Sequence, residues 1–285
     1  MPTAVPSRVN PPTPKAPAAN KSYVTIAMPG NTAYREMNEF ERYKKEAEKA
    51  AFSGWDFSFL KGRFIEKDLS WNYREIVKSK IRKSDVLLDM GTGGGEFILS
   101  LKDFLPASTF ATEGYKPNIQ IATKTLAPLG IDVIEIENDE NLPFENETFD
   151  LIINRHESYS CKELNRIIKR GGLFITQQVG DMDNIELNHF FDDNSRDEND
   201  WCLSGAVEEL KKNGIKIKYK KEEFVDGRFL DIGAIIYYLK VITWQIPGFK
   251  IEENLGKLKE LHQKIKKESG FSTRQHRFII VGEKG

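Results

Sequence analysis

The sequence predicts an α/β fold built on a mostly parallel sheet. From residue 85 onward, short apolar runs of strand length alternate with segments of helical periodicity, a pattern typical of βαβ units. A glycine-rich turn follows the first of these strands and opens a helix. Hydrophobic residues make up 39% of the 285 residues and aromatic residues 11%, which is enough to bury a core. We therefore expect one elaborated domain or two small ones.

The first residues are expected to lie outside this fold. Seven of the 12 prolines fall in the first 30 residues, among Ala, Ser, Thr and Asn. Such a stretch buries too little apolar surface to offset the entropy lost on ordering. We expect residues 1–31 to form a disordered, proline-rich leader, with a proline-rich partner motif as the alternative.

Residues 32–82 are expected to form a helical and aromatic cap. Residues 34–52 have the spacing of an amphipathic helix that stops before Gly54, and Ser70 is expected to cap a second helix over residues 71–81. An aromatic cluster lies between and within these segments: Trp55, Phe57, Phe59, Trp71 and Tyr73. Ordinary packing of the cap against the sheet is one interpretation of this cluster.

Seven strands and their connecting helices are expected in residues 83–285. The strands cover residues 86–90, 108–112, 132–137, 149–154, 173–179, 215–224 and 278–281. The helices between them cover residues 96–104, 118–126, 161–169 and 203–212, and the last two end at glycines. Residues 232–273 form an insert between the last two strands, with an apolar run and a basic amphipathic helix over residues 254–267.

Composition excludes several classes of protein. A formal net charge of -1 argues against non-specific nucleic-acid binding, which needs an excess of cations. No apolar run reaches the roughly 18 to 20 residues that span a bilayer, and the N-terminus has no apolar signal core. Cys161 and Cys202 are far apart and form no CxxC. We expect a cytoplasmic protein without metal site, disulfide, membrane association or nucleic-acid partner.

A glycine-rich loop follows the first strand and runs from Asp89 to Glu96. Glycine lets the backbone turn tightly and approach a ligand closely. A dinucleotide fingerprint fits at Gly91 and Gly93 but meets Glu96 at its third glycine position, where an acidic side chain is unsuited to a pyrophosphate. The lysine of a phosphate-binding P-loop is also missing. The loop instead matches acidic-x-Gly-x-Gly-x-Gly, which Gly95 completes.

With this pattern the sequence resembles the class I S-adenosylmethionine (SAM) dependent methyltransferases, in a form like methyltransferase type 11. Four further landmarks agree in order and spacing: Glu113 at the end of the second strand, residues 138–144, residues 149–154 and residues 170–174. The resemblance implies a Rossmann-like, doubly wound, seven-stranded sheet, mostly parallel with an antiparallel last strand, and an N-terminal helical lid. It also implies SAM as the cofactor.

The resemblance assigns candidate residues to the cofactor. Glu113 is expected to accept hydrogen bonds from the ribose hydroxyls. Asn138 stands where many relatives carry an aspartate, so the adenine contact is expected to pass to Asp139 or Glu140. The expected cofactor-binding residues are Asp89, Gly91, Gly93, Gly95, Glu113, Asp139, Glu140 and Asn154.

The acceptor is expected beside residues 154–159, because ligands of open α/β sheets bind beyond the carboxyl ends of the strands. His156 is a candidate general base, since its ordinary pKa lies near neutrality. Binding of the acceptor without proton transfer and simple bracing of the loop are the alternatives for His156. The candidate substrate residues are Arg155, Glu157, Tyr159 and Gln178. Arg155 is expected to pair with Glu157 or with an acidic acceptor.

Two aromatic groups are candidates to cover this site. The first is the cap cluster, because in related enzymes such N-terminal segments fold over the cofactor. The second comprises Tyr237, Tyr238 and Trp244 of the insert. Two aromatic covers favour a small, partly apolar acceptor. The sequence therefore predicts a methyltransferase that uses SAM to methylate a small molecule, as a monomer or homodimer. An RNA or protein methyltransferase and an inactive SAM-binding protein are the alternatives.

Overall fold

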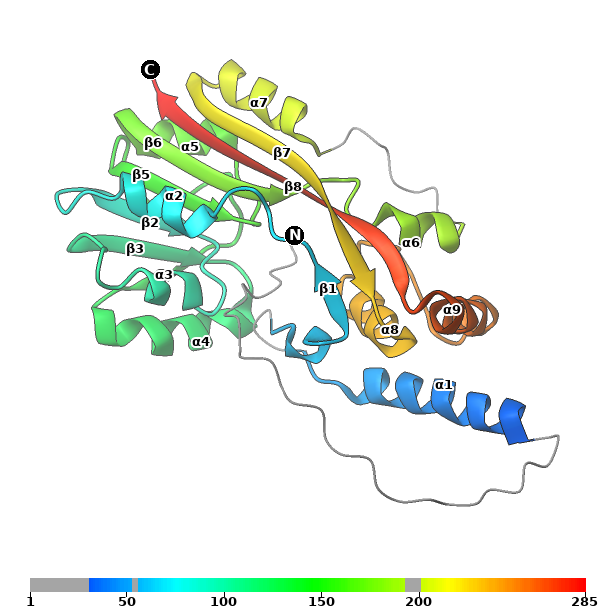
Figure 1. Ribbon diagram of the computed structural model, residues 1–285. Coiled ribbons are helices and arrows are strands. Elements are labelled where there is room, and N and C mark those ends of the chain that lie inside the picture. Colours follow the sequence, from blue (N-terminus) through cyan, green and yellow to red (C-terminus); the bar gives the residue numbers. More distant parts are fainter. Residues whose placement is uncertain (1–30, 53–55, 193–200) are drawn as a thin grey trace, which may run out of the picture.

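The computed structural model describes residues 31–52, 56–192 and 201–285, with side chains from residue 39 onward. Residues 1–30 of the expected leader and Trp55 of the aromatic cluster lie outside the described residues. The described strands form one eight-stranded sheet in the order β1-β7-β8-β6-β5-β2-β3-β4. Figure 1 shows this twisted sheet, with the blue N-terminal helix at the end away from β2 to β5.

Half of the sheet is parallel, as the alternation of strands and helices predicts. Its strands are β2 (Val86–Met90), β3 (Ser108–Glu113), β4 (Val133–Glu135), β5 (Phe149–Arg155) and β6 (Ile168–Val179). The pairs β2–β3, β2–β5, β3–β4 and β5–β6 are all parallel. The helices of this half are α2 (Tyr73–Lys80), α3 (Glu96–Ser100), α4 (Lys116–Leu126), α5 (Cys161–Ile167) and α7 (Leu203–Lys212).

Both faces of the parallel strands are buried, because helices cover each of them. Successive strand residues point to opposite faces, so Leu87 lies in one hydrophobic cluster and Leu88 in the other. The Leu87 cluster is completed by α2, α3 and α4, and the Leu88 cluster by α5 and α7. This is the doubly wound arrangement that the resemblance implies.

The other half of the sheet is antiparallel. Strand β8 (Phe271–Lys284) runs against β6, which confirms the predicted antiparallel last strand, and β7 (Ile215–Phe229) runs against β8. The short β1 (Phe64–Glu66) pairs with the far end of β7 and adds an eighth strand that the sequence pattern did not predict. Three residues are too few to show a strand period.

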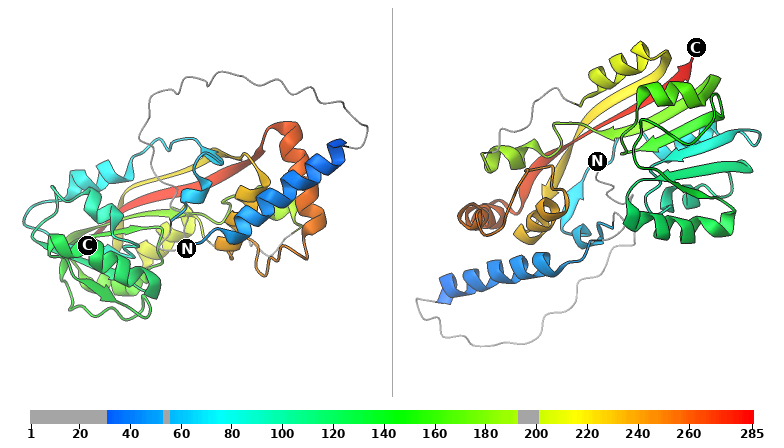
Figure 2. Two further views of the ribbon diagram at one scale, coloured as in Figure 1. Left: turned by 90° about the horizontal axis from the view of Figure 1, so that it is seen from below. Right: turned by 180° about the vertical axis from the view of Figure 1, so that it is seen from behind.

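Strands β7 and β8 extend well beyond their predicted ends. The added part of β8 buries polar side chains on both faces of the sheet, because the consecutive residues Gln275, His276 and Arg277 are all buried. Hydrophobic alternation therefore does not mark this part of the strand. The long antiparallel pair of β7 and β8 projects beyond the parallel strands, with helices at its far end (Figures 1 and 2).

A second hydrophobic core lies at that far end. It is formed by α1 (Asn31–Lys49), the turn η1 (Ser58–Leu60), β1, α6 (Ile185–Phe190), α8 (Ile232–Val241) and α9 (Leu255–Glu268), together with the ends of β7 and β8. The apolar run at the start of the insert is α8, whose residues 232–239 are all buried. Figure 2 shows α1 lying beside α8 and α9. The N-terminal segment and the insert therefore share one core.

Some predicted boundaries are wrong for local reasons. Asn72, and not Ser70, caps α2, since its side chain accepts a hydrogen bond from the Glu75 N–H. Ser70 donates both its N–H and its hydroxyl to Glu223 on β7. The helix predicted to reach residue 169 ends at Ile167, because Ile168 begins β6 opposite Phe149. The division into a leader, a cap and a larger domain stays a prediction.

Within residues 31–52, 56–192 and 201–285, each helix is too short or too polar to serve as a bilayer-spanning segment.

Candidate functional site

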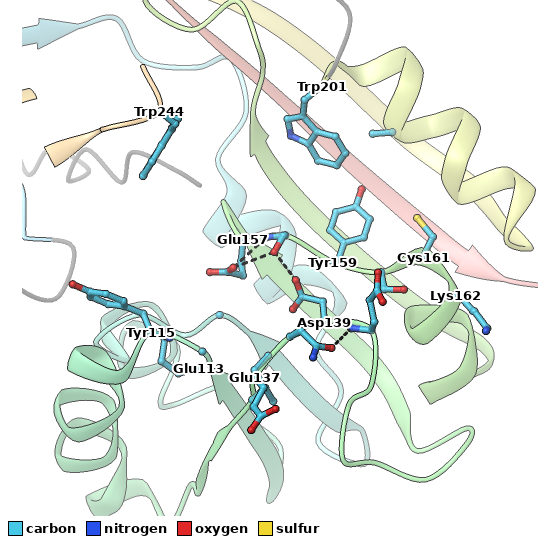
Figure 3. Close-up of a pocket in the computed structure, with 18 of the residues that line it drawn as sticks. Glu113, Tyr115, Glu137, Asp139, Glu157, Tyr159, Cys161, Lys162, Trp201 and Trp244 are labelled. Carbon is cyan, nitrogen blue, oxygen red and sulfur yellow. Dashed lines mark hydrogen bonds between the residues drawn. The ribbon is translucent and has the colours of Figure 1, made fainter. Parts of the chain in front are cut away.

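A cavity of about 1160 Å³ lies beyond the carboxyl ends of the parallel strands. Its walls include residues that directly follow β2, end β3, follow β4 and follow β5: Gly91, Glu113, residues 136–140 and residues 157–162. Trp201 borders it at the start of α7, and Lys240 and Trp244 border it from the insert. Figure 3 shows these side chains gathered around the open space. Its place at the strand ends is where open α/β sheets bind ligands.

The glycine loop bends because three of its residues are left-handed. Gly91, Gly93 and Gly95 have φ angles of 68°, 62° and 86°, a region that residues with a Cβ enter only at a cost. A Cβ placed on Gly91 would lie 2.3 Å from Cγ of Glu157. The Gly93 N–H donates to Oε2 of Glu113 at 2.7 Å. The missing side chains thus allow the loop to pass close to two carboxylates.

Glu113 is 2% exposed, yet its carboxylate lines the cavity. Its Oε1 accepts the Tyr115 N–H at 2.8 Å, and its Oε2 accepts from Gly93 and, at 3.5 Å, from Asn118 Nδ2. Burial raises the pKa of Glu113, while these hydrogen bonds oppose the rise. Each carboxylate oxygen has about two acceptor sites, so Oε2 is filled and Oε1 retains at most one site for a ribose hydroxyl of the kind that the resemblance assigns to Glu113.

Asp89 is fully enclosed beneath the loop at the end of β2. Burial raises the pKa of Asp89 to about 7, the Thr92 side chain opposes the rise, and Glu113 adds to it. Asp89 is therefore electrostatically coupled to the cofactor side of the cavity. It supports the loop from below, whereas the expectation of direct cofactor contact stays a prediction.

The turn after β4 forms another wall of the cavity. Asn138 uses its side chain to accept the Glu140 N–H at 3.0 Å, so it holds the turn. Asp139 accepts a hydrogen bond from the Ser158 hydroxyl, which ties this turn to the loop after β5. Burial raises the pKa of Asp139. Both Asp139 and Glu140 line the cavity, at the position where the resemblance expects adenine.

His156 lies away from the residues that line the cavity. It has a left-handed φ of 62°, and its N–H donates to the Gln177 carbonyl at 2.7 Å. Trp71 Nε1 donates to Gln177 Oε1 at 2.8 Å, so the amide nitrogen of Gln177 faces His156 Nε2 at 3.1 Å. Burial, with Arg155 and Arg277 nearby, holds the pKa of His156 well below its usual range. These contacts support the bracing alternative for His156.

Glu157 and Tyr159, in contrast, face the cavity (Figure 3). Burial raises the pKa of Glu157 to about 7, and Asp139 and Glu113 act in the same direction. The Tyr159 ring packs edge-on against Phe174 and Trp201, with centroids 5.0 and 5.9 Å away. The structure thus separates neighbouring residues of one loop into a buried side and a cavity side.

Three other predicted site residues point into the protein. Asn154 is fully buried, and its Oδ1 accepts from Thr176 at 2.8 Å and from Gln178 at 2.6 Å. Gln178 also donates to the Glu157 carbonyl at 2.9 Å, so it holds the loop from behind. Arg155 lies over the Phe97 ring at 5.6 Å, on the side of the sheet that carries α3. The predicted direct contacts of these three residues with ligands stay untested predictions.

The aromatic residues that were expected to cover the site also divide into buried and cavity-lining residues. Trp71 and Tyr73 pack in the core against the sheet, and the Tyr73 hydroxyl donates to the Asn154 carbonyl at 2.9 Å. Tyr237 and Tyr238 are buried in the second core. Of the three insert aromatics, Trp244 lines the cavity.

Trp201, Lys240 and Glu209 line the cavity without having been predicted as site residues. Glu209 and the start of α7 are brought there because α7 packs beside α5 on one face of the sheet. Helical periodicity predicts the position of α7 in the sequence. It does not show that polar residues of this helix border the cavity. Among the described residues, no group of three His, Cys, Asp or Glu side chains is arranged to hold a metal ion.

Comparison with known proteins gives independent information about the chain. A family model described as Methyltransferase domain matches residues 88–176. An uncharacterized protein of Methanocaldococcus jannaschii is 29% identical over 198 residues, which cover 64% of this chain and 68% of that protein. A malonyl-[acyl-carrier protein] O-methyltransferase of Marinomonas sp. is 28% identical over 137 residues, or 45% of this chain and 51% of that enzyme. The chain thus spans about half the length of the Marinomonas relative.

Solved structures share the fold. A Bacillus halodurans protein described as a methyltransferase by inference matches with a TM-score of 0.55 at 14% identity, over 74% of this chain and 96% of that one. A Deinococcus radiodurans protein of unknown function matches with a TM-score of 0.55 at 14% identity, over 86% of this chain and 100% of that one. The matched family segment contains the glycine loop and Glu113, and the fold is the one that the resemblance implies. Residues 88–176 therefore match a methyltransferase domain, and the chain has the Rossmann-like fold of SAM-dependent methyltransferases.

Proposed function

We propose that this methyltransferase modifies a small-molecule acceptor bound in the cavity beyond β2 to β5. The observation that carries the proposal is the extent of the cavity, which reaches from Glu113 to Trp244 within one space of about 1160 Å³. Sites for one small ligand usually measure about 300 to 1,000 Å³, so this space accommodates SAM and a second small molecule.

The donor set on one side of the cavity fits SAM. Glu113 supplies a carboxylate oxygen for a hydroxyl, Gly91 lines the cavity beside Glu157, and Asp139 and Glu140 border the adenine position. SAM supplies a methyl group activated on a sulfonium, and the chain's own contribution is to hold the two reactants in line. Orientation of this kind can provide effective molarities of about 10⁵ to 10⁸ M.

The cap and the insert border the side of the cavity that we assign to the acceptor. Phe52 reaches the cavity from the segment after α1, and Val241 and Trp244 reach it from the insert. The second core joins these two segments, so they cover the acceptor side as one body. We include in the proposal that the protein acts in the cytoplasm as a monomer or homodimer, without nucleic-acid or membrane partner.

A second candidate is methylation of an acceptor tethered to a carrier protein. The observation that favours it is the 28% identity over 137 residues to a protein named as a malonyl-[acyl-carrier protein] O-methyltransferase. A tethered acceptor requires an open path from the cavity to solvent for its linker. The assay described next separates it from a free acceptor.

The test is a turnover assay with SAM labelled on its methyl group and a cell extract divided by dialysis. Unreacted SAM is itself dialysable and is first removed by chromatography; we then expect label in a dialysable product with the wild type but not with Glu113→Gln. Label in the retained protein would favour a carrier-bound or protein acceptor, and label in RNA would contradict the small-molecule proposal. A chain that binds SAM and labels neither fraction would be a SAM-binding protein without turnover.

A further inference from the structure

The Glu157 carboxylate occupies a central position in the cavity. A Cβ on Gly91 would lie 2.8 Å from Glu157 Oε2, so the carboxylate packs against the first glycine of the loop. Its Oε1 accepts the Ser158 N–H at 3.3 Å, whereas Oε2 has no hydrogen-bond donor in the described part of the chain. In Figure 3 the carboxylate points into the open space on the side of Trp244 and Tyr115. Oε2 is therefore free to accept a hydrogen bond from a ligand in the cavity.

Aromatic side chains surround the acceptor part of the cavity. Tyr159 and Trp201 pack at 62° with their centroids 5.9 Å apart, and Trp244 is 37% exposed on the insert side. The Tyr159 hydroxyl is buried and has no hydrogen-bond partner among the described residues. The faces of such rings attract cations, most strongly in the case of tryptophan.

The charges on the cavity wall favour a cation. Six carboxylates line it: Glu113, Glu137, Asp139, Glu140, Glu157 and Glu209. The lining lysines are Lys162 and Lys240. Lys240 is already engaged, because its Nζ donates to the carbonyls of Ala47 and Ala50 at 2.7 Å each. A cavity lined mainly by one sign of charge concentrates ligands of the opposite sign.

We propose that the methyl acceptor is a small amine, whose ammonium form is bound by the Glu157 carboxylate between the rings of Tyr159, Trp201 and Trp244. This inference rests on the proposed function, since it names the class of molecule that the acceptor belongs to. Aromatic rings beside the Glu157 carboxylate, in a cavity lined mainly by carboxylates, match an alkyl or aryl amine better than a neutral or anionic acceptor.

Glu157 also accepts the proton that the ammonium must lose before its nitrogen can be methylated. The ammonium first gives a proton to the carboxylate, which leaves a neutral amine with a free electron pair. The amine nitrogen then forms the new N–C bond as the methyl–sulfur bond breaks and its electron pair stays on sulfur. Burial raises the pKa of Glu157 to about 7, so the group can take up a proton near neutral pH and release it to solvent afterwards.

One rival role for Glu157 must be separated from this one. The amino-acid part of SAM carries its own ammonium, and a carboxylate beside Gly91 is also placed to bind it. S-adenosylhomocysteine (SAH), the demethylated product, keeps that ammonium. Loss of SAH affinity in Glu157→Gln therefore indicates the rival role, and unchanged SAH affinity excludes it.

The experiment is calorimetry on the full chain saturated with SAH. The ligands are phenethylamine, phenethyl alcohol and phenylacetate, and the pair butylamine and butanol repeats the comparison at a smaller size. We expect each amine to bind at least about tenfold more tightly than its alcohol, and phenylacetate to bind most weakly, as expected for a charged hydrogen bond. Glu157→Gln should remove the amine preference and leave the affinities for SAH and the alcohols unchanged.

The control variant is Glu208→Gln, which removes the same charge one residue before Glu209. Glu208 lies on the outer face of α7, where it pairs with Lys212. It should retain the amine preference in full. Tyr159→Phe gives a second reading of the acceptor wall if Glu157→Gln does not fold, and it should weaken amine binding by several-fold.

The outcomes separate this inference from the proposed function. A wild-type chain that does not bind SAH contradicts both. A chain that binds SAH but shows no preference for amines over alcohols overturns the amine inference alone, as does an amine preference that survives in Glu157→Gln.

Discussion

Glu113 is the residue on which cofactor affinity depends most directly. Glu113→Ala removes the carboxylate that accepts from Gly93 and faces the cavity. Hydrogen bonds to a charged group contribute about 1.5 to 3 kcal/mol, so we expect the Kd for SAH to rise by about 10- to 100-fold. Calorimetry measures this, and circular dichroism shows whether the variant is folded. An unchanged Kd would move the ribose site away from Glu113.

Gly91→Ala tests the contact between the glycine loop and Glu157. The new methyl group would meet Cγ of Glu157 at 2.3 Å, and the φ of 68° adds strain of about 1 to 2 kcal/mol. Gly130→Ala is a matched control, because Gly130 has the same φ of 68° and open space where a Cβ would lie. Gly91→Ala should lose more stability than Gly130→Ala in urea unfolding, because only the new methyl group at Gly91 meets Glu157, and Gly91→Ala alone should lose most of its turnover. Equal turnover in the two variants would show that the contact has no part in the reaction.

The carboxyl group of Glu157 makes stability depend on pH. Its pKa is raised from 4.5 to about 7 in the folded chain, so the folded state binds the proton more tightly than the unfolded state does. Stability should therefore fall as pH rises through the window from about 4.5 to 7, by at most about 3 kcal/mol for this group. Urea unfolding of the wild type and Glu157→Gln at both ends of the window isolates the effect. The variant should show the smaller decrease, and identical slopes would contradict the assignment.

At the scale of single elements, Lys240 links α8 to the end of α1. Its ammonium donates to the carbonyls of Ala47, Glu48 and Ala50, which α1 leaves without partners at its C-terminus. Lys240→Met should destabilise the end of α1 by about 1.5 to 3 kcal/mol, a loss typical of hydrogen bonds to a charged group. Hydrogen exchange of residues 40–50 measures this. The exposed Lys212→Met serves as control, and equal protection in both variants would show that the contact contributes nothing.

The elements show which parts of the fold the sequence can predict. Strands β2, β3 and β5 and helix α7 are predicted to within one residue, because they carry clear apolar runs or a helical period, whereas β6 begins at Ile168 and not at residue 173. The long β7–β8 pair is underestimated, since the added part of β8 buries consecutive polar residues, and β1 and α6 are too short to show a period. Hydrophobic pattern predicts elements with apolar faces and misses those held by buried hydrogen bonds.

The candidate site follows a similar rule. The glycine loop is predictable, since left-handed turns require glycine. Glu113 is predictable because the resemblance assigns an acidic residue to the end of the second strand. Residues 156–159 follow β5, but the sequence does not show that His156 turns inward while Glu157 turns toward the cavity. That division depends on the left-handed φ of His156 and on its contact with Gln177 from the next strand.

At the scale of the whole molecule, two hydrophobic cores meet at one cavity. The doubly wound core supplies the strand ends with the glycine loop, and the second core supplies Trp244 and the segment near Lys240. Strands β7 and β8 contribute residues to both cores, so this pair fixes the distance between the two walls of the cavity. The parallel sheet thus provides the cofactor side, and the cap and insert determine the space left for an acceptor.

The most direct test of this account is equilibrium dialysis of the full chain against labelled SAM and, separately, against labelled NAD. We predict saturable binding of one SAM per chain, competed by SAH and weakened by Glu113→Ala, with no saturable binding of NAD. Saturable binding of NAD without binding of SAM would contradict it.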